Sequence, residues 1–364
     1  MSKYLVLLSL ILVTSCSSKL CDLEDIYTSS EPQCEGSPCP PAIPKSLTTT
    51  HARVDKHTIE ESFTDAYRSY IYTPASPAPA KAPVILFLHG YFDAKPDRYD
   101  AMLRHYARNG YIVIYPTFGS ALYAKSWADN AAEAYKRAIA YLNDHSAVKP
   151  DPTRLAYIGH SIGGILAFHM AEKALTPAPK LIVTSDAAGI STIAYPFVTI
   201  DQLSHIPAET KVLMMMAEET YRARYKENDL CADDSKKDLA DNCTGFSANL
   251  RAIKRSPQIP AENKATLLIS SETRGGVELK SDHNGAQGEC GVEKRPINAI
   301  DTWGYWRYTL TALNSVLKDE GEFSSLNRED MRRLGKWSDG QAAKPALSLN
   351  SCFNADQCPA LDHQ

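Results

Sequence analysis

Residues 154–175 read RLAYIGHSIGGILAFHMAEKAL, and this stretch decides the fold. After Arg154 it continues with a short apolar run at 155–158, which is typical of a strand buried on both faces of a sheet. It continues as GHSIGG at 159–164 and then as a helical pattern. A serine between a buried strand and a helix fits a sharp turn that holds its hydroxyl ready for attack, and the glycines at 159 and 163 leave the space that such a turn needs. Ser161 is therefore the predicted nucleophile.

Buried apolar runs and helical patterns alternate on both sides of this stretch. The predicted strands are 68–74, 84–88, 111–115, 155–158, 181–184, 212–216 and 265–270, and the predicted helices are 98–109, 129–143, 165–174 and 302–317. Strands that alternate with helices indicate an α/β class with a mainly parallel, doubly wound sheet. The run of methionines at 214–216 is expected to fill the core of one such strand.

The turn, its flanks and the order of elements resemble the α/β-hydrolase superfamily over residues 65–318. The resemblance implies two backbone N–H groups that stabilise the oxyanion of a tetrahedral intermediate. One lies in the loop after strand 84–88, where the sequence reads HGYF at 89–92, and it maps to Tyr91. The other follows the nucleophile and maps to Ile162. His89 is expected to shape this loop rather than to react.

The superfamily places its catalytic histidine after the last strand. Of the ten histidines, only His283 and His363 lie beyond residue 205, and His363 is at the C-terminus. His283 stands in SDHNG at 281–285, a polar loop after strand 265–270. We predict that His283 is the general base. His160 is expected to point away from the nucleophile.

The acid that orients this base has candidates at two strand ends. Asp186 follows strand 181–184, whereas Glu218 and Glu219 follow the next strand, which is the commoner position in the superfamily. Asp186 resembles the acid of chlorophyllases and of platelet-activating-factor acetylhydrolases, which share the G-H-S-x-G-G elbow and the H-G loop. A short side chain also suits a fixed partner for an imidazole, so we favour Asp186 over Glu218 or Glu219. Outside these motifs the chain shows no clear match to either family, and their substrates do not transfer.

The chemistry of the predicted triad favours a carboxylic ester hydrolase that acts through an acyl-enzyme. Serine at 161 excludes dehalogenases and epoxide hydrolases, which need aspartate there, and dienelactone hydrolases, which need cysteine. An alkoxide leaves more easily than an amine, so a small-molecule or lipid-like ester is the expected substrate and no cofactor is required. The alternatives are a polyester hydrolase, an amidase or peptidase on the same triad, and a non-catalytic envelope lipoprotein that retains the fold.

The first residues indicate export. Lys3 precedes an apolar run at 4–13, which is too short for a transmembrane helix, and small residues follow it. The tetrad VTSC at 13–16 resembles a bacterial lipobox, which implies a signal peptide at 1–15, lipidation of Cys16 and membrane attachment; Ser17 favours the outer membrane. The alternative is a simple secretory signal with a periplasmic or extracellular protein and Cys16 in a disulfide.

The cysteines support an oxidising compartment. There are nine, and removal of Cys16 leaves an even set that suits disulfides, with Cys231–Cys243 and Cys352–Cys358 as the expected local pairs. No CxxC pair or paired histidines accompany them, so no metal is expected. The predicted domains are a Cys/Pro-rich tether at 16–45, a catalytic domain at 46–318 and a disulfide-stapled C-terminal extension at 319–364.

The composition fits one large globular domain. The chain has 364 residues, of which 44% are hydrophobic and 23% charged, and its formal charge is -4. No clustered basic surface is indicated, so nucleic acid is not an expected partner. The stretch 190–207 is expected to form part of a lid, with Tyr195 and Phe197 facing either the pocket or the core, and 221–247 a surface excursion. Trp127 is expected to be a buried structural residue.

Overall fold

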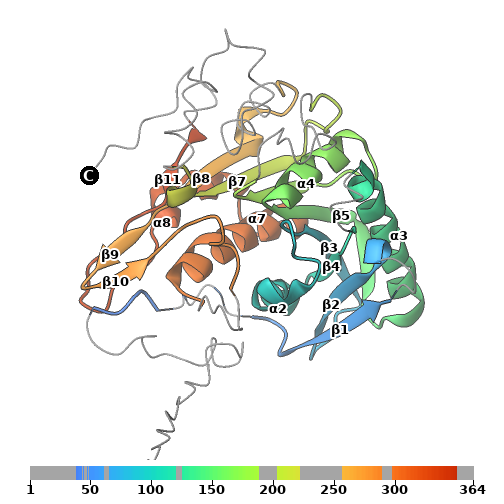
Figure 1. Cartoon of the computed structure of the whole chain (residues 1–364), viewed down its shortest axis with the longest axis horizontal. Helices are drawn as coiled ribbons and strands as arrows, with labels where there is room; N and C mark the ends of the chain where they lie inside the picture. The colour runs from blue at the N-terminus through green and yellow to red at the C-terminus, as the bar shows by residue number, and fades with distance from the viewer. Residues whose placement is uncertain are drawn as a thin grey trace, which may run out of the picture.

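A mixed sheet runs through the molecule in the order β1-β2-β4-β3-β5-β6-β7-β8-β11 (Figure 1). The computed structural model describes residues 38–350 except 43, 45–46, 48, 61–64, 120–124, 188–202, 222–255 and 289–296. The strands of this sheet are β1 (Arg53–Ile59), β2 (Ser69–Ala75), β3 (Lys81–Leu88), β4 (Ile112–Pro116), β5 (Lys149–His160), β6 (Leu181–Ser185), β7 (Lys211–Ala217), β8 (Lys264–Ile269) and β11 (Leu347–Ser348). A separate two-stranded sheet pairs β9 (Glu272–Arg274) with β10 (Val277–Leu279).

The centre of the main sheet is parallel, and its edges are antiparallel. Strands β4, β3, β5, β6, β7 and β8 form successive parallel pairs, whereas β1, β2 and β11 pair antiparallel. This arrangement confirms the predicted α/β-hydrolase fold with a mainly parallel sheet. Because β3 lies between β4 and β5, the chain leaves β3 and β5 toward opposite sides of the sheet. Such a switch point opens a crevice at the carboxyl ends of the two strands, where ligands bind in open α/β sheets.

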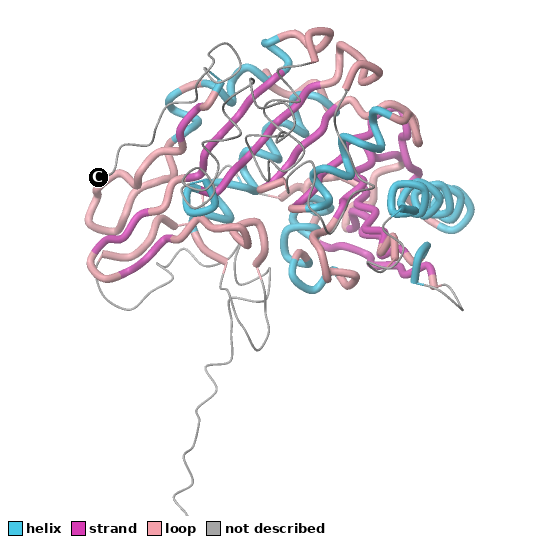
Figure 2. Tube along the Cα trace, turned by 45° about the horizontal axis from the view of Figure 1, so that its top comes forward, coloured by secondary structure: helices cyan, strands magenta, loops and turns pink. Residues whose placement is uncertain are grey.

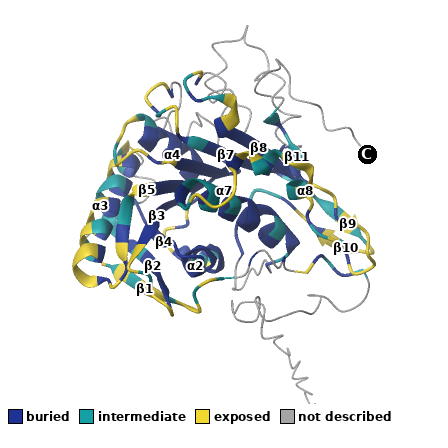
Figure 3. Cartoon of the chain, turned by 180° about the vertical axis from the view of Figure 1, so that it is seen from behind, coloured by how far each residue is buried: buried dark blue, intermediate teal, exposed yellow. Residues whose placement is uncertain are grey.

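Helices cover both faces of the sheet. In β3, Ile85 and Phe87 belong to the core on one face, and Val84, Leu86 and Leu88 to the core on the other. The first face carries α2 (Asp100–Arg108) and α7 (Arg307–Leu317), and the second carries α3 (Trp127–His145) and α4 (Ile162–Glu172). The strands lie between these helices and are largely buried (Figures 2 and 3). Burial on both faces explains why the central strands are continuous apolar runs.

The short helices connect these main elements. They are η3 (Asp65–Tyr67), η4 (Pro96–Arg98), η8 (Ala261–Asn263), the π-helix η9 (Ile300–Trp306) that leads directly into α7, η10 (Phe323–Asn327) and α8 (Glu329–Arg332). The predicted strands and helices are all present, with bounds that differ by a few residues, except that β5 begins several residues earlier than predicted. Trp127 and the methionines at 214–216 are buried as predicted.

The chain beyond Lys318 continues in the same core. Leu326, Leu334 and Trp337 are buried there, and Leu347 and Ser348 pair with Leu268 and Leu267 of β8. The segment thereby covers the β8 edge of the sheet, which would otherwise present unpaired backbone groups.

Several predictions concern residues that the structure does not describe. Cys39 is disulfide-bonded, and the other eight cysteines, including the expected pairs Cys231–Cys243 and Cys352–Cys358, lie outside the described residues. The signal peptide, the lipidation residue Cys16, most of the tether, Tyr195, Phe197 and nearly all of the excursion at 221–247 lie outside them too. Within the described part of the chain, no helix combines the length and apolarity that crossing a membrane requires.

Candidate active site

Ser161 stands alone between β5 and α4, at the switch point of the sheet. Its backbone has φ 54° and ψ −122°, a conformation that non-glycine residues rarely adopt. The turn is tight on both sides, since a Cβ on Gly163 would lie 2.0 Å from the carbonyl oxygen of Leu88, and one on Gly159 would lie 2.3 Å from that of Gly163. The two glycines are therefore required for space, as the sequence predicts.

His283 approaches Ser161 from a loop after the β9–β10 hairpin. Its Nε2 lies 3.0 Å from the Oγ of Ser161, although the two residues are 122 positions apart in the sequence. The loop turns tightly at this point, where the N–H of Gly285 donates to the carbonyl of Asp282 at 2.7 Å. A general base must lie within hydrogen-bond reach of the proton that it removes, and His283 does.

Asp186 follows β6 directly and is buried. Strand β7 holds both its backbone and its side chain. The backbone N–H of Asp186 donates to the carbonyl of Met215 at 2.9 Å, and its Oδ1 accepts from the N–H of Ala217 at 3.0 Å. Its Oδ2 is shielded from solvent, and so is the Nδ1 of His283. Asp186 also has a φ of 44°. A buried carboxylate thus stands at the end of the strand next to β5.

Glu218, one of the two alternative acids, already binds other groups. It is buried, and both of its carboxylate oxygens lie 3.0 Å from the Nζ of Lys344 in the C-terminal segment. Its Oε2 also accepts from the backbone N–H of Ser271 at 2.9 Å. The side chain of Glu218 therefore links the ends of β7 and β8 to the C-terminal segment. Glu219, the other alternative, donates its backbone N–H to the carbonyl of Ser281 at 3.0 Å and is only partly buried.

The loop after β3 contains the predicted oxyanion residue Tyr91. His89 fixes the base of this loop: its ring stacks on Phe118 at a centroid distance of 4.0 Å, its Nδ1 lies 2.6 Å from the carbonyl oxygen of Gly90, and its Nε2 lies 3.1 Å from that of Thr117. Burial lowers the pKa of His89 to about 4, so its ring is neutral near pH 7. His89 shapes the loop, as its predicted role requires.

The two predicted oxyanion donors belong to separate segments, the loop after β3 and the start of α4. Tyr91 belongs to a turn in which the N–H of Asp93 donates to the carbonyl of Gly90 at 3.3 Å. Ile162 is the first residue of α4, and a helix N-terminus carries partial positive charge that favours a developing anion. The ring of Tyr91 lies 6.3 Å from that of the buried Trp127.

Phe92 follows Tyr91 in the same loop and is exposed. Its side chain is 88% accessible, and it is the exposed large apolar side chain of the described residues. Its φ is 70°, and its ring centroid lies 3.9 Å from that of Tyr91. Phe92 carries no functional signal in the sequence, because exposure of a single apolar residue cannot be deduced from a loop sequence. Phe92 therefore gives the loop after β3 an exposed apolar side chain.

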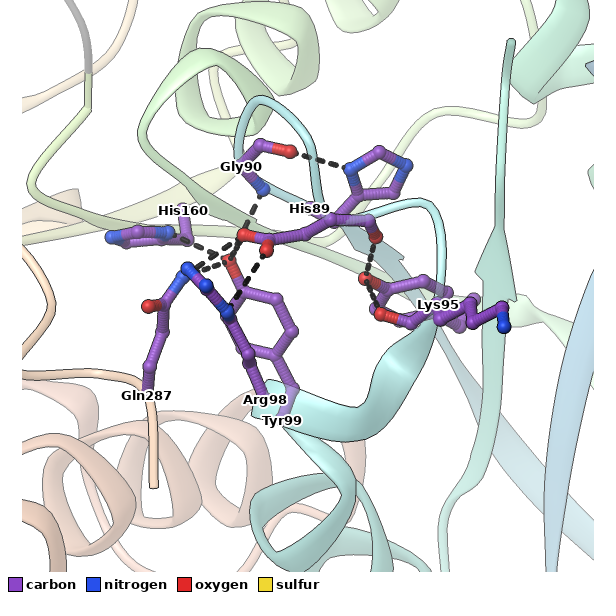
Figure 4. A network of polar contacts seen from close by, with 9 residues as sticks. His89, Gly90, Lys95, Arg98, Tyr99, His160 and Gln287 are labelled. Atoms are coloured by element: carbon purple, nitrogen blue, oxygen red, sulfur yellow. Dashed lines mark hydrogen bonds and ion pairs between the residues drawn. The ribbon is translucent and has the colours of Figure 1, made fainter. Parts of the chain in front are cut away.

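His160 precedes Ser161 in the chain, and both nitrogens of its ring contact groups other than the Ser161 hydroxyl. The ring is buried; its Nδ1 lies 2.8 Å from the hydroxyl of Tyr99, and its Nε2 lies 2.7 Å from the backbone carbonyl oxygen of His283. Burial and, secondarily, the neighbouring His283 lower the pKa of His160 to about 3. Tyr99 in turn contacts Asp93 and Gln287 (Figure 4). Tyr99, Asp93 and Gln287 belong to no motif in the sequence, so no role is predicted for them from the sequence alone.

Within the part of the chain that the structure describes, no three His, Cys, Asp or Glu side chains gather in a way that could hold a metal ion. The groups that the geometry does assemble are a hydroxyl, an imidazole and the end of a helix. Together they can remove the proton of the serine hydroxyl next to a helix N-terminus, which stabilises negative charge.

Comparison with known proteins agrees with this fold. The family model described as chlorophyllase matches residues 45–194, which is less than half of the chain. The matched segment includes Tyr91, Ser161 and Asp186 and ends before His283. No curated protein matches the chain. The similarity is to an α/β-hydrolase-like family and suggests an ester hydrolase of that kind.

Proposed function

We propose that this protein is a serine hydrolase that cleaves carboxylic esters through an acyl-enzyme intermediate. The observation that carries the proposal is the 3.0 Å separation between the Nε2 of His283 and the Oγ of Ser161, at a strained turn between β5 and α4. A serine hydroxyl becomes a useful nucleophile only when a base is in place to accept its proton. The chlorophyllase match over residues 45–194 supports the choice of ester chemistry.

In the proposed reaction, His283 accepts the proton of Ser161 while Oγ forms a bond to the ester carbonyl carbon. The carbonyl oxygen becomes an oxyanion and accepts hydrogen bonds from the backbone N–H groups of Tyr91 and Ile162. The intermediate then collapses, the bond to the alkoxide breaks, and His283 returns its proton to the departing alcohol. Water repeats the sequence on the acyl-enzyme, with His283 again as base, and releases the acid.

We assign the orienting acid to Asp186. Both carboxylate oxygens of Glu218 bind Lys344, whereas Asp186 is buried at the end of β6, the strand next to the one that precedes Ser161. Asp186→Asn should lower kcat by about four orders of magnitude, because an amide no longer holds the productive tautomer of the base. Glu218→Gln and Glu219→Gln are the matched controls and should keep kcat within about tenfold. The assignment is wrong if only a glutamate variant loses turnover.

The substrate class is limited to esters with an accessible carbonyl. An alkoxide leaves more readily than an amine, so ester hydrolysis is favoured over peptidase activity. The exposed Phe92 beside the oxyanion loop favours an apolar acyl or alcohol group. The matched segment ends before His283, so the proposal does not extend to the substrate that the matched family's name implies.

We further propose that the chain is exported and anchored through lipidated Cys16. This rests on the sequence VTSC at 13–16 after a short apolar run. Radioactive palmitate supplied to expressing cells should label the wild type, and Cys16→Ala should remove the label. A Cys16→Ala protein that still takes up label would contradict the anchor without affecting the hydrolase.

The experiment that tests the function is turnover of p-nitrophenyl esters of short and long acyl chains. The protein without its signal peptide should hydrolyse at least one of them. Ser161→Ala and His283→Ala should each lose at least about 10³-fold in kcat while remaining folded by circular dichroism. Equal turnover by wild type and Ser161→Ala would contradict the proposal, and so would the absence of turnover on every ester of the panel.

A further inference from the structure

We propose that Tyr99, His160, Asp93 and Gln287 form a buried positioning network (Figure 4). The network fixes the relative positions of the loop that carries His283, the loop that carries Tyr91 and the turn at Ser161. The inference rests on the proposed hydrolase function and deepens it. These residues do not touch the reacting atoms, and they act through the backbone of residues that do. They are therefore positioning residues, and their effect should appear in turnover.

The hydroxyl of Tyr99 is the hub of the network. It accepts the backbone N–H of Gly90 at 3.1 Å and the Nε2 of Gln287 at 2.9 Å, and it lies 2.9 Å from the Oδ2 of Asp93 and 2.8 Å from the Nδ1 of His160. All of these groups are buried. Loss of one member leaves at least one buried polar group short of a hydrogen-bond partner, which is costly in a buried network.

His160 connects this hub to the base. A backbone carbonyl can only accept, so the Nε2 of His160, 2.7 Å from the carbonyl oxygen of His283, must carry the ring proton. The low pKa of about 3 keeps the ring neutral, so its Nδ1 carries no proton and lies 2.8 Å from the Tyr99 hydroxyl, whose single proton points either to the Oδ2 of Asp93 or to this nitrogen. One tautomer of His160 thus bridges the hub and the backbone of His283.

Asp93 and Gln287 complete the network through a direct contact with each other. The Nε2 of Gln287 donates to the Oδ2 of Asp93 at 2.9 Å as well as to Tyr99. The Oδ1 of Asp93 lies 3.6 Å from the Nε of Arg98, which is partly exposed. Gln287 follows His283 by four residues, so the loop of the base is attached at two points, the His283 carbonyl and the Gln287 side chain.

The two arms of the network end where the proposed mechanism needs precision. One arm holds the N–H of Gly90, the residue before the oxyanion donor Tyr91, and the other holds the carbonyl of the base His283. A Cβ on Gly90 would lie 3.0 Å from both the Oδ2 of Asp93 and the Nδ1 of His160, so the network occupies the space of a side chain there. A displacement of about 1 Å at such a place can reduce the rate by about hundredfold.

The first test removes the hub. Tyr99→Phe should lower kcat for p-nitrophenyl acetate by roughly ten- to hundredfold with KM within about threefold, because substrate contacts persist and alignment is lost. The matched control is Tyr111→Phe, which deletes a buried hydroxyl that donates to Asn314 at 2.6 Å outside the site. Both variants are assayed well below their melting temperatures. A folded Tyr99→Phe protein with wild-type kcat overturns the proposal.

The second test separates the two arms at one position and does not depend on Tyr99→Phe folding. In His160→Gln the amide nitrogen takes the place of Nε2 and keeps the bond to His283, whereas in His160→Asn the amide oxygen takes the place of Nδ1 and keeps only the bond to Tyr99. Gln should therefore retain about tenfold more kcat than Asn at similar melting temperature. An Asn variant as active as the Gln variant, or more active, overturns the proposal.

The hydrolase itself is checked separately in the same experiment. Wild type must turn over the ester, and Ser161→Ala must not, before the network variants are compared. If both conditions hold and the network variants match wild type, the network is wrong and the hydrolase stands. If Ser161→Ala matches wild type, the proposed function fails first.

Discussion

The substitution Gly163→Ala tests how tightly the nucleophile turn is packed. Gly163 lies in the first turn of α4, and a Cβ there would lie 2.0 Å from the carbonyl oxygen of Leu88 and 2.6 Å from that of His89. These are backbone atoms at the end of β3, in the centre of the sheet, and they move only with the strand. The added methyl group should therefore push the oxyanion loop away from Ser161.

Two effects of opposite sign decide the stability change. Alanine is better than glycine within a helix by about 1 kcal/mol. Overpacking of a well-packed core costs roughly 1–3 kcal/mol, and the upper end applies where the clashing atoms are backbone. The net destabilisation is then about 2 kcal/mol, which lowers Tm by about 3 °C in a domain of this size. Turnover should fall by about hundredfold, because the oxyanion donor moves relative to the nucleophile.

The measurements are a thermal melt and p-nitrophenyl ester kinetics on both Gly163→Ala and a control, Gly304→Ala. Gly304 lies in the buried π-helix η9, where the three atoms nearest to a Cβ would all belong to the side chain of Ile269, with the Cγ2 at 3.2 Å, so a shift of a few tenths of an ångström relieves the contact. Gly304→Ala should keep Tm within about 1 °C and leave turnover unchanged. A Gly163→Ala protein with the Tm and turnover of wild type would refute the reasoning about the turn.

Three further outcomes are expected. Burial lowers the pKa of His89 to about 4 and those of His105 and His160 to about 3, all below the ordinary 6.5. Below about pH 6.5 the unfolded chain thus binds more protons than the folded chain. The contribution of these histidines to the free energy of unfolding should therefore be fully present above this pH and be lost as the pH falls toward 4. Equal stability against urea at about pH 7.5 and about pH 5 would contradict this. Truncation after Lys318 removes β11 and buried side chains such as Trp337, each worth roughly 2–5 kcal/mol against a total of about 5–15, so the product should not unfold cooperatively by circular dichroism, and a sharp wild-type-like transition would speak against it. Phe92→Ala should leave stability within about 0.5 kcal/mol but raise KM by roughly three- to tenfold for long-chain esters only; an equal change for acetate esters would exclude a role in binding the apolar group.

The fold could be predicted where each element carries its own pattern. The central strands are buried on both faces, so they appear in the sequence as continuous apolar runs, and their order along the chain indicates a parallel sheet. Strand β1 was missed because its sequence RVDKHTI is largely polar and accessible, and only its pairing with β2 makes it a strand. Strand β11 has two residues and no period at all. Its place in the sheet depends on contacts with β8 that no local pattern announces.

The candidate site divides in the same way. The elbow around Ser161 is contiguous in sequence, and His283 could be reached by elimination among ten histidines. The network behind them could not be predicted, because Tyr99 and Gln287 come from separate segments and are ordinary residues in their local sequence. His160 was expected to point away from the nucleophile, and its ring does contact Tyr99 and the backbone of His283 instead. These side chains meet only because the fold packs three segments together: the one with Tyr99, the end of β5 and the loop with Gln287.

The most direct test of the central claim is covalent labelling of the protein with a fluorophosphonate, followed by intact-mass and peptide mass spectrometry. This reagent reacts with a serine that a neighbouring base has activated. The account predicts one adduct per chain, located on Ser161, and a labelling rate at least about 10³-fold lower in His283→Ala. No adduct on the folded wild type, or an adduct on another residue, would contradict it.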